Sequence, residues 1–403
     1  MSLPNRIQTT VMTLNMEPAK KFTNFQTSAV FIFALLTVLI LQNAKLTTSA
    51  SYAIVAAVYA MVPVILLSRG TYEIPIKRIY ASLFLLFSSI FFIRVVFDPA
   101  LFDLLRLATL LSFTAVNLFL ISQITEFEVF LYILNRLSAI VVIAGLLPFF
   151  GFPSEVGFID LSFWGTFSTY DLTIITSVFV NPNQLGFFTL IGTIAALVER
   201  QQTESRISIL FLGINAIGLF SSHYRAGWIA LLASLGLFYT YSAFGRRGII
   251  IATVGGIFSI AIGLSMLFGI IPGPEKLTTV SLNGRRELWT ASVRALQTNP
   301  LIGHRLSGTH EIVGNPHNSY LRIFTSFGLI GGIIYTILVI GPTVGSSREA
   351  VSYNGVVLTM LLVSMLIIQI LNQLTFIGTS MRSSIIAIVM GYHFSRWNTV
   401  INS

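Results

Sequence analysis

The chain has 403 residues, of which 54% are hydrophobic and only 10% are charged, and its formal net charge is +9. Soluble domains average roughly a quarter charged residues, so this composition indicates an integral membrane protein and excludes an ordinary soluble fold. The basic residues are expected at helix ends beside anionic lipid or phosphate, and no nucleic-acid partner is expected. The absence of cysteine excludes disulfides and thiolate metal sites.

Apolar segments follow one another along the chain, most of them near the roughly 20 residues that a spanning helix needs. We predict twelve helices, at about 27–42, 50–68, 78–97, 104–122, 128–150, 182–199, 207–222, 226–243, 248–271, 319–341, 352–371 and 378–395. The segments are apolar on all faces and do not alternate, which favours an all-α polytopic bundle over a β-barrel. The first segment lacks an Ala-x-Ala-like exit and is interpreted as a retained helix.

The basic residues predict an orientation. With the N-terminus in the cytoplasm, the cytoplasmic connections carry Arg69, Lys77, Arg78, Arg200, Arg206, Arg246, Arg247 and Arg348. The loop 151–171 on the opposite side has no Lys or Arg. The positive-inside rule therefore predicts that both termini lie in the cytoplasm. Residues 1–403 would form one membrane domain, with 272–318 as a large periplasmic loop between helices nine and ten.

A short amphipathic helix is predicted inside that loop. Leu288, Trp289, Val293 and Leu296 fall roughly on one helical face, and Asn299-Pro300 ends the segment. One interpretation is a helix lying on the membrane surface. The alternative is an anion site, because a helix N-terminus and the guanidinium groups of Arg285 and Arg286 both suit phosphate.

Two other helix starts on the same side carry candidate residues. Arg225 opens the eighth helix close to Trp228, where an interfacial arginine beside an anchoring tryptophan is one interpretation and phosphate binding is the other. Asn181 precedes Pro182 at the start of the sixth helix, which an N-cap followed by proline at the first helical position explains structurally. Asn183 could instead bind a sugar hydroxyl.

His317 directly precedes the tenth helix. Imidazole is the side chain best suited to take a proton near neutral pH. Its predicted position on the same side as Arg225 and Arg285 would place a base beside phosphate-binding groups, which suits transfer from a pyrophosphate-linked donor. Spacing alone leaves three other candidates for the base: His223, His304 and His310.

Several kinds of site are missing from the sequence. We find no paired carboxylates suited to glycoside hydrolysis and no Asp-x-Asp for a metal-bound nucleotide sugar. The chain also lacks a His-Glu-x-x-His motif and a P-loop. A metal site is therefore disfavoured, and no cofactor is expected.

Together these residues resemble the O-antigen ligase and polymerase superfamily of bacterial integral membrane glycosyltransferases. The ligases have a pattern of His, then Asn, Ser or Gln, nine residues, Gly, two residues, and Gly, Thr or Tyr. This chain has His317-Asn318, then Gly328 and Gly331 at that spacing. The motifs Asn181-Pro182-Asn183, Arg225 before Ala226-Gly227-Trp228, and Asn299-Pro300-Leu301-Ile302-Gly303 are similar too, so that the resemblance covers roughly residues 180–340.

The resemblance implies a protein of the bacterial inner membrane that carries out a metal-independent, inverting transfer of a glycan from undecaprenyl pyrophosphate at the periplasmic face of the lipid bilayer. His317 would activate the acceptor hydroxyl, and Arg225 and Arg285 would bind the pyrophosphate and stabilise its charge as it leaves. Further substrate-binding candidates are Arg286 (a substitute for Arg285), Asn318, Asn181, Asn183, Arg322 and Arg382.

The acceptor distinguishes two activities within the family. A polymerase uses another lipid-linked glycan, whereas a ligase uses lipid A-core. The loop 272–318 has few features suggesting a docking surface for a heavily phosphorylated core, which favours the polymerase. A flippase or transporter is the alternative of another class, and it predicts charged or broken helices at mid-membrane, where Arg136 is the clear basic residue. A purely structural membrane protein would leave the outer arginines unexplained.

Overall fold

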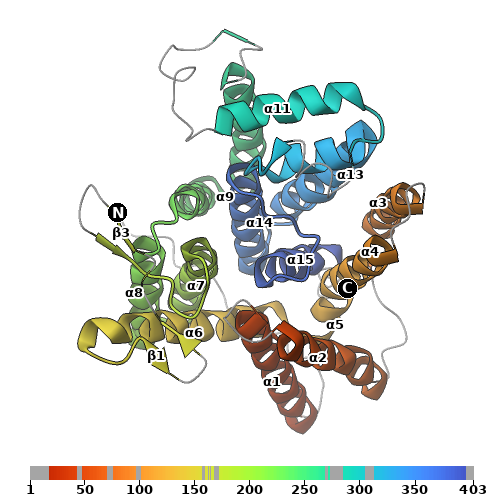
Figure 1. Ribbon diagram of the computed structural model, residues 1–403. Coiled ribbons are helices and arrows are strands. Elements are labelled where there is room, and N and C mark those ends of the chain that lie inside the picture. Colours follow the sequence, from red (N-terminus) through yellow and green to blue (C-terminus); the bar gives the residue numbers. More distant parts are fainter. Residues whose placement is uncertain are drawn as a thin grey trace.

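Apolar helices make up most of the computed structural model of the protein (Figure 1). The structure describes residues 18–42, 48–69, 76–96, 101–156, 159–161, 163, 165–167, 172–267, 271–272, 285–304 and 313–395. The helices are α1 (Pro18–Gln42), α2 (Thr48–Ser68), α3 (Arg78–Val96), α4 (Leu101–Ala115), the π-helix η1 (Val116–Leu120), α5 (Ile121–Ile124), α6 (Phe127–Leu146), the 3-10 helix η2 (Leu147–Phe150), α7 (Pro182–Thr203), α8 (Arg206–Ser221), α9 (Arg225–Leu267), α11 (Arg285–Thr298), α13 (Ser319–Arg348), α14 (Tyr353–Leu371) and α15 (Met381–Phe394).

Within the described residues, the predicted apolar segments are helical over most of their length, and the last of them begins at Met381. The eighth and ninth predicted helices run together as α9, and the break expected between them lies at Gly245, whose φ is 61°. Among the described residues, five helices are long and apolar enough to cross a membrane, namely Leu107–Ile124, Phe127–Phe150, Arg225–Gly263, Ser319–Arg348 and Tyr353–Leu371. The crossing of all twelve segments, and their assignment to one domain, stay predictions.

The loop after α6 contains short strands that the all-α prediction missed. β1 (Glu155–Val156) pairs antiparallel with β2 (Ile159–Asp160), and β3 (Gly165–Phe167) pairs antiparallel with β4 (Leu172–Ile174). Strands of two or three residues are too short to show the alternation of apolar and polar residues from which a strand is predicted. Both hairpins lie outside the helices.

The core is centred on α14 and α15. Side chains along both helices are fully buried, as Leu361 and Ile385 illustrate, and α14 packs against both α9 and α13. Figure 1 shows α14 and α15 in the middle of the bundle, with the pair α1 and α2 at one edge. The segment that joins α14 to α15 is therefore surrounded by other helices, and this segment reaches the candidate site.

The two ends of the bundle gather different residues. At one end, Lys77 Nζ donates to Glu349 Oε1 at 2.7 Å, and Asn354 Nδ2 donates to Glu128 Oε1 at 2.7 Å. This end contains connections that the charge pattern assigns to the cytoplasm. Helices α13 and α14 run from it to the opposite end, where the candidate site residues lie. The grouping of residues agrees with the predicted topology, and the side of the membrane that each end faces stays a prediction.

Candidate active site

The predicted amphipathic helix is present as α11, and it packs on α13 (Figure 1). Its buried residues are Trp289, Ser292 and Ala295, whereas Val293, on the predicted apolar face, is 37% exposed. At 100° per residue the buried stripe is centred near Ser292, a small residue that permits close approach, and Val293 falls at its rim. Because Trp289 Nε1 also donates to the Pro316 carbonyl at 2.6 Å, α11 is tied to protein and does not simply rest on lipid.

The turn after α11 fits into a break in α13. Gly303 and Gly328 both have left-handed backbones, with φ of 67° and 66°. Leu329 N donates to the Pro300 carbonyl at 2.7 Å. A Cβ added to Gly328 would lie 2.2 Å from the carbonyl carbon of Leu301, so only glycine permits this contact. The first glycine of the His-Asn pattern therefore has a structural role, which is to let the turn bind α13.

His317 lies in the segment between α11 and α13, and its side chain is exposed. Its own backbone is left-handed, with φ of 48°. The His317 amide donates to Asn315 Oδ1 at 3.0 Å. Asn318 is the N-cap of α13, since its Oδ1 accepts from Leu321 N at 3.0 Å. Asn318 thus positions the segment, and its expected contact with substrate stays a prediction.

Arg285 and His317 interact electrostatically. The pKa of His317 is lowered, first by partial burial and second by the positive charge of Arg285. A lowered pKa keeps the imidazole neutral near pH 7, which is the form that accepts a proton. Arg285 is held in place because its Nη1 donates to the Leu371 carbonyl at the end of α14, at 2.9 Å. An imidazole that favours its neutral form and a fixed guanidinium therefore interact here.

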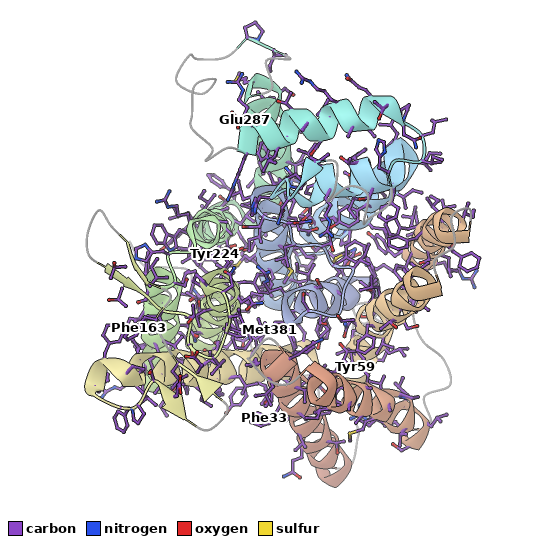
Figure 2. All side chains as sticks on the ribbon, viewed as in Figure 1. Phe33, Tyr59, Phe163, Tyr224, Glu287 and Met381 are labelled. Atoms are coloured by element: carbon purple, nitrogen blue, oxygen red, sulfur yellow. The ribbon has the colours of Figure 1, made fainter. Side chains whose placement is uncertain are left out.

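Tyr224 brings Arg382 to the same region. The Tyr224 side chain is 1% exposed, and burial raises its pKa while the charges of Arg382 and Arg285 oppose that rise. Its hydroxyl accepts from Asn372 Nδ2 at 3.2 Å. Figure 2 labels Tyr224, which directly precedes α9. Arg382, in the first turn of α15, has a buried Nε without a hydrogen-bond partner among the described residues. Two arginines thus face one buried tyrosine.

Arg322 joins the site through Gln373. When the Gln373 amide oxygen faces Arg322, it accepts from Arg322 Nε at 2.6 Å and from Nη1 at 2.5 Å. The amide nitrogen of Gln373 then lies against Asn315 Oδ1, the same atom that accepts from the His317 amide. The network places Arg322, which lies in the first turn of α13, beside the segment that carries His317.

The start of α7 also lies against Tyr224. A Cβ added to Gly186 would be 2.2 Å from Tyr224 Cβ, so this glycine permits the two segments to approach. Asn181 is the predicted N-cap, and its side chain accepts from Asn183 N at 2.8 Å. Asn183 lies three residues before Gly186 and so on the same face of α7. The helical turn that contains Asn183 therefore faces Tyr224. The structural role of Asn181 is confirmed.

The remaining predicted arginines are on the surface near these elements. Arg225 is exposed and begins α9 immediately after Tyr224. Arg286 is also exposed, and it lines an open cavity of about 740 Å³ along α11 together with Arg294. The neighbour of Arg286 labelled in Figure 2, Glu287, lies on the same helix. Of the two adjacent arginines, Arg285 is the one whose charge acts on His317.

The alternative bases lie in different settings. His304 Nε2 lies 2.7 Å from the Ala295 carbonyl and 3.0 Å from Thr298 Oγ1, which ties it to the end of α11. His223 is close to the Trp228 ring, with centroids 6.1 Å apart. His310 lies outside the described residues. These contacts give His304 a sufficient structural role.

Three residues of the site were not predicted from the sequence. Tyr224, Asn372 and Gln373 are polar groups that the fold brings to Arg285, Arg382 and Arg322. A signal for two of them is visible, since Asn372-Gln373 directly follows the 19-residue apolar helix α14. Among the described residues, no group of three or more His, Asp or Glu side chains could hold a metal ion.

Residues 209–336 match a family model described as O-antigen ligase. A curated protein of Haemophilus influenzae, described as uncharacterized, is 23% identical over 192 residues, which cover 39% of this chain and 47% of that protein. The match therefore spans about half the length of this relative. The resemblance to the O-antigen ligase and polymerase superfamily is confirmed, and the matched region contains Arg225, Arg285 and His317.

Proposed function

We propose that the protein transfers a glycan from undecaprenyl pyrophosphate to an acceptor sugar hydroxyl at the periplasmic face of the bacterial inner membrane, as a polymerase of envelope polysaccharide. The observation that carries this proposal is the electrostatic effect of Arg285 on His317. The charge of Arg285 lowers the pKa of His317, so a proton acceptor lies beside a group suited to bind a leaving pyrophosphate.

His317 acts as general base in this mechanism. Its neutral imidazole takes the proton of the acceptor hydroxyl while the oxygen attacks the anomeric carbon of the donor. The bond between that carbon and the pyrophosphate oxygen breaks, and both electrons leave with the undecaprenyl pyrophosphate. Attack opposite the leaving group inverts the anomeric configuration. The departing pyrophosphate gains a negative charge as this bond breaks, and cationic groups can stabilise that charge without a second proton donor.

Arg285 is the main candidate for that stabilisation. One of its five N–H groups is used by the Leu371 carbonyl, which fixes the guanidinium and leaves the others for phosphate oxygens. It also opens α11, where backbone N–H groups and the helix dipole favour an anion. Arg225 follows Tyr224 in the chain, and the charge of Arg382 acts on Tyr224 from α15. We assign both arginines to binding of the pyrophosphate.

We assign contacts with the sugars to residues that surround His317 and the pyrophosphate-binding arginines. Asn183, Arg322 and Arg286 are the candidates with exposed or half-buried side chains. Asn181 and Asn318 use their side-chain oxygens as helix caps, so their contribution is to hold these candidates and His317 in place.

The transporter alternative is weakened by the pairing of Arg136. Both Nη atoms of this arginine donate to the carboxylate of Glu199, at 2.5 and 2.7 Å, and Asn135 Nδ2 donates to the same carboxylate at 2.9 Å. A charge inside the bundle that is paired and hydrogen-bonded between α6 and α7 has a structural explanation. The residue that suggested a translocation path therefore gives no support for one.

The test compares surface glycan and lipid-linked intermediates in a host that lacks the gene and carries wild-type, His317→Ala or His223→Ala protein. We expect His317→Ala to give no polymer at normal membrane protein level, with single repeats accumulating on the carrier, and His223→Ala to be active. Long chains stranded on the carrier would instead identify a ligase with lipid A-core as acceptor. Normal polymer with His317→Ala would refute the assignment of the base.

A further inference from the structure

The segment 371–374, which begins at the last residue of α14, makes contacts with three separate parts of the site. The Leu371 carbonyl accepts from Arg285 of α11, and Asn372 Nδ2 donates to the Tyr224 hydroxyl ahead of α9. Ser319, the first residue of α13, bonds the segment twice. Its hydroxyl donates to the Asn372 carbonyl at 2.9 Å and accepts from the backbone N–H of residue 374 at 2.6 Å. One short segment therefore sets the relative positions of elements far apart in the chain.

Gln373 is the member of this segment that reaches Asn315, two residues before His317. When its amide is turned so that the oxygen faces Arg322, that oxygen accepts from Arg322 Nε and Nη1, and the amide nitrogen lies against the side-chain amide of Asn315, both Oδ1 and Nδ2. Asn315 Oδ1 in turn accepts from the His317 backbone N–H at 3.0 Å. A continuous chain of polar contacts thus runs from Arg322 through Gln373 and Asn315 to the backbone of His317.

The conformation of His317 requires such support. Its φ of 48° is left-handed, a region that residues with a Cβ rarely adopt. Pro316 before it is held by Trp289, and Asn318 after it is held by its cap on α13. The contact of Asn315 with the His317 amide lies between these anchors, and Gln373 orients the Asn315 side chain that makes it.

We propose that Gln373 is a positioning residue that holds His317 at a fixed place relative to Arg285. The same segment, 371–374, binds Arg285 through its first carbonyl and the His317 turn through Gln373, so that the base and the donor-binding arginine share one support. This inference rests on the proposed function. A displacement of about 1 Å in a catalytic group can reduce turnover about 100-fold, so loss of Gln373 should lower kcat more than it raises KM.

The test uses Gln373→Met, which keeps side-chain length and removes both hydrogen-bonding groups. Gln201→Met is the matched control, because Gln201 bonds Tyr353 at the other end of the bundle. We expect Gln373→Met to lower kcat about 10- to 100-fold with KM changed less than threefold, and the control to be unchanged. Asn315→Ala and the double variant complete a cycle, in which the double variant should be no worse than the more impaired single variant.

A second readout does not depend on transfer. Diethyl pyrocarbonate modifies neutral imidazole, and mass spectrometry of peptides reports the rate at each histidine. The modification rate of His317 should change severalfold in Gln373→Met, while that of His223 in the same sample stays constant. An unchanged His317 rate, a defect confined to KM, or additive losses in the cycle would each overturn the inference.

The two proposals can fail separately. If His317→Ala retains activity, the proposed base is wrong, yet an altered modification rate in Gln373→Met would still show that Gln373 positions His317. If His317→Ala is inactive and Gln373→Met has normal kcat, the proposed function stands and the positioning role is refuted.

Discussion

Gly328→Ala is expected to detach the turn after α11 from α13. The added methyl group would lie 2.2 Å from the carbonyl carbon and oxygen of Leu301 and 2.5 Å from Ile302 N, which are backbone atoms that cannot rotate away. The φ of 66° at Gly328 adds roughly 1–2 kcal/mol of strain for alanine.

Moving the turn away also breaks two backbone hydrogen bonds. Leu329 N donates to the Pro300 carbonyl, and His304 N donates to the Thr325 carbonyl, each at 2.7 Å. At about 1 kcal/mol for each bond, and with the strain included, the docked turn should be destabilised by roughly 3–4 kcal/mol. Because α11 carries Arg285, the damage should reach the site as well as the stability of the protein.

The assay is thermal unfolding of the purified protein in detergent together with glycan transfer in membranes. Gly328→Ala should melt at a lower temperature and lose most activity. Gly236→Ala is the matched control, because Gly236 is helical and, apart from the backbone of its own helix, no atom lies within 4 Å of the added Cβ. This variant should be neutral or slightly stabilising. Gly303→Ala, whose Cβ would lie 2.4 Å from Gly328 N, should reproduce the defect without adding to it in the double variant. A Gly328→Ala protein with wild-type melting and transfer would refute this account of the pattern.

Three further predictions concern the chemistry. Arg225→Lys should lower transfer about tenfold or more, because an ammonium group cannot form the two parallel hydrogen bonds of a guanidinium; wild-type turnover would exclude bidentate contact with the pyrophosphate. The value of kcat/KM should fall at acid pH as His317 becomes protonated. This fall should be centred below the ordinary pKa of histidine, because burial and the charge of Arg285 both lower the pKa of His317. Arg285→Gln should shift this acid limb to higher pH, since the pKa of His317 rises when the neighbouring charge is removed, and a limb that does not move would show that the two residues are uncoupled. EDTA should leave transfer unchanged, whereas inhibition that a divalent cation reverses would contradict the metal-independent mechanism.

Much of the helical scaffold could be predicted because it depends on local properties of the chain. Apolar runs of about 20 residues can satisfy their backbone groups in lipid only as helices or closed barrels, so their approximate bounds follow from hydropathy. The cap at Asn181 and the end of α11 near Asn299-Pro300 were predicted for the same reason, because each depends on residues within one turn.

The arrangement of the site depends on contacts between distant parts of the chain. Hydropathy and motif spacing placed His317, Arg225 and Arg285 on one side, but could not show that Arg285 bonds the end of α14 or that Gln373 reaches Asn315. The choice between Arg285 and Arg286 likewise depended on how α11 rotates against α13. Periodicity predicted an amphipathic helix here, but the buried stripe is centred near Ser292 and leaves Val293 exposed. The sequence by itself therefore determined which segments are helices and which residue types face one end of the bundle. Only the tertiary structure decided which of those residues meet, because side-chain contacts between helices depend on how each helix is rotated and packed, which local sequence does not specify.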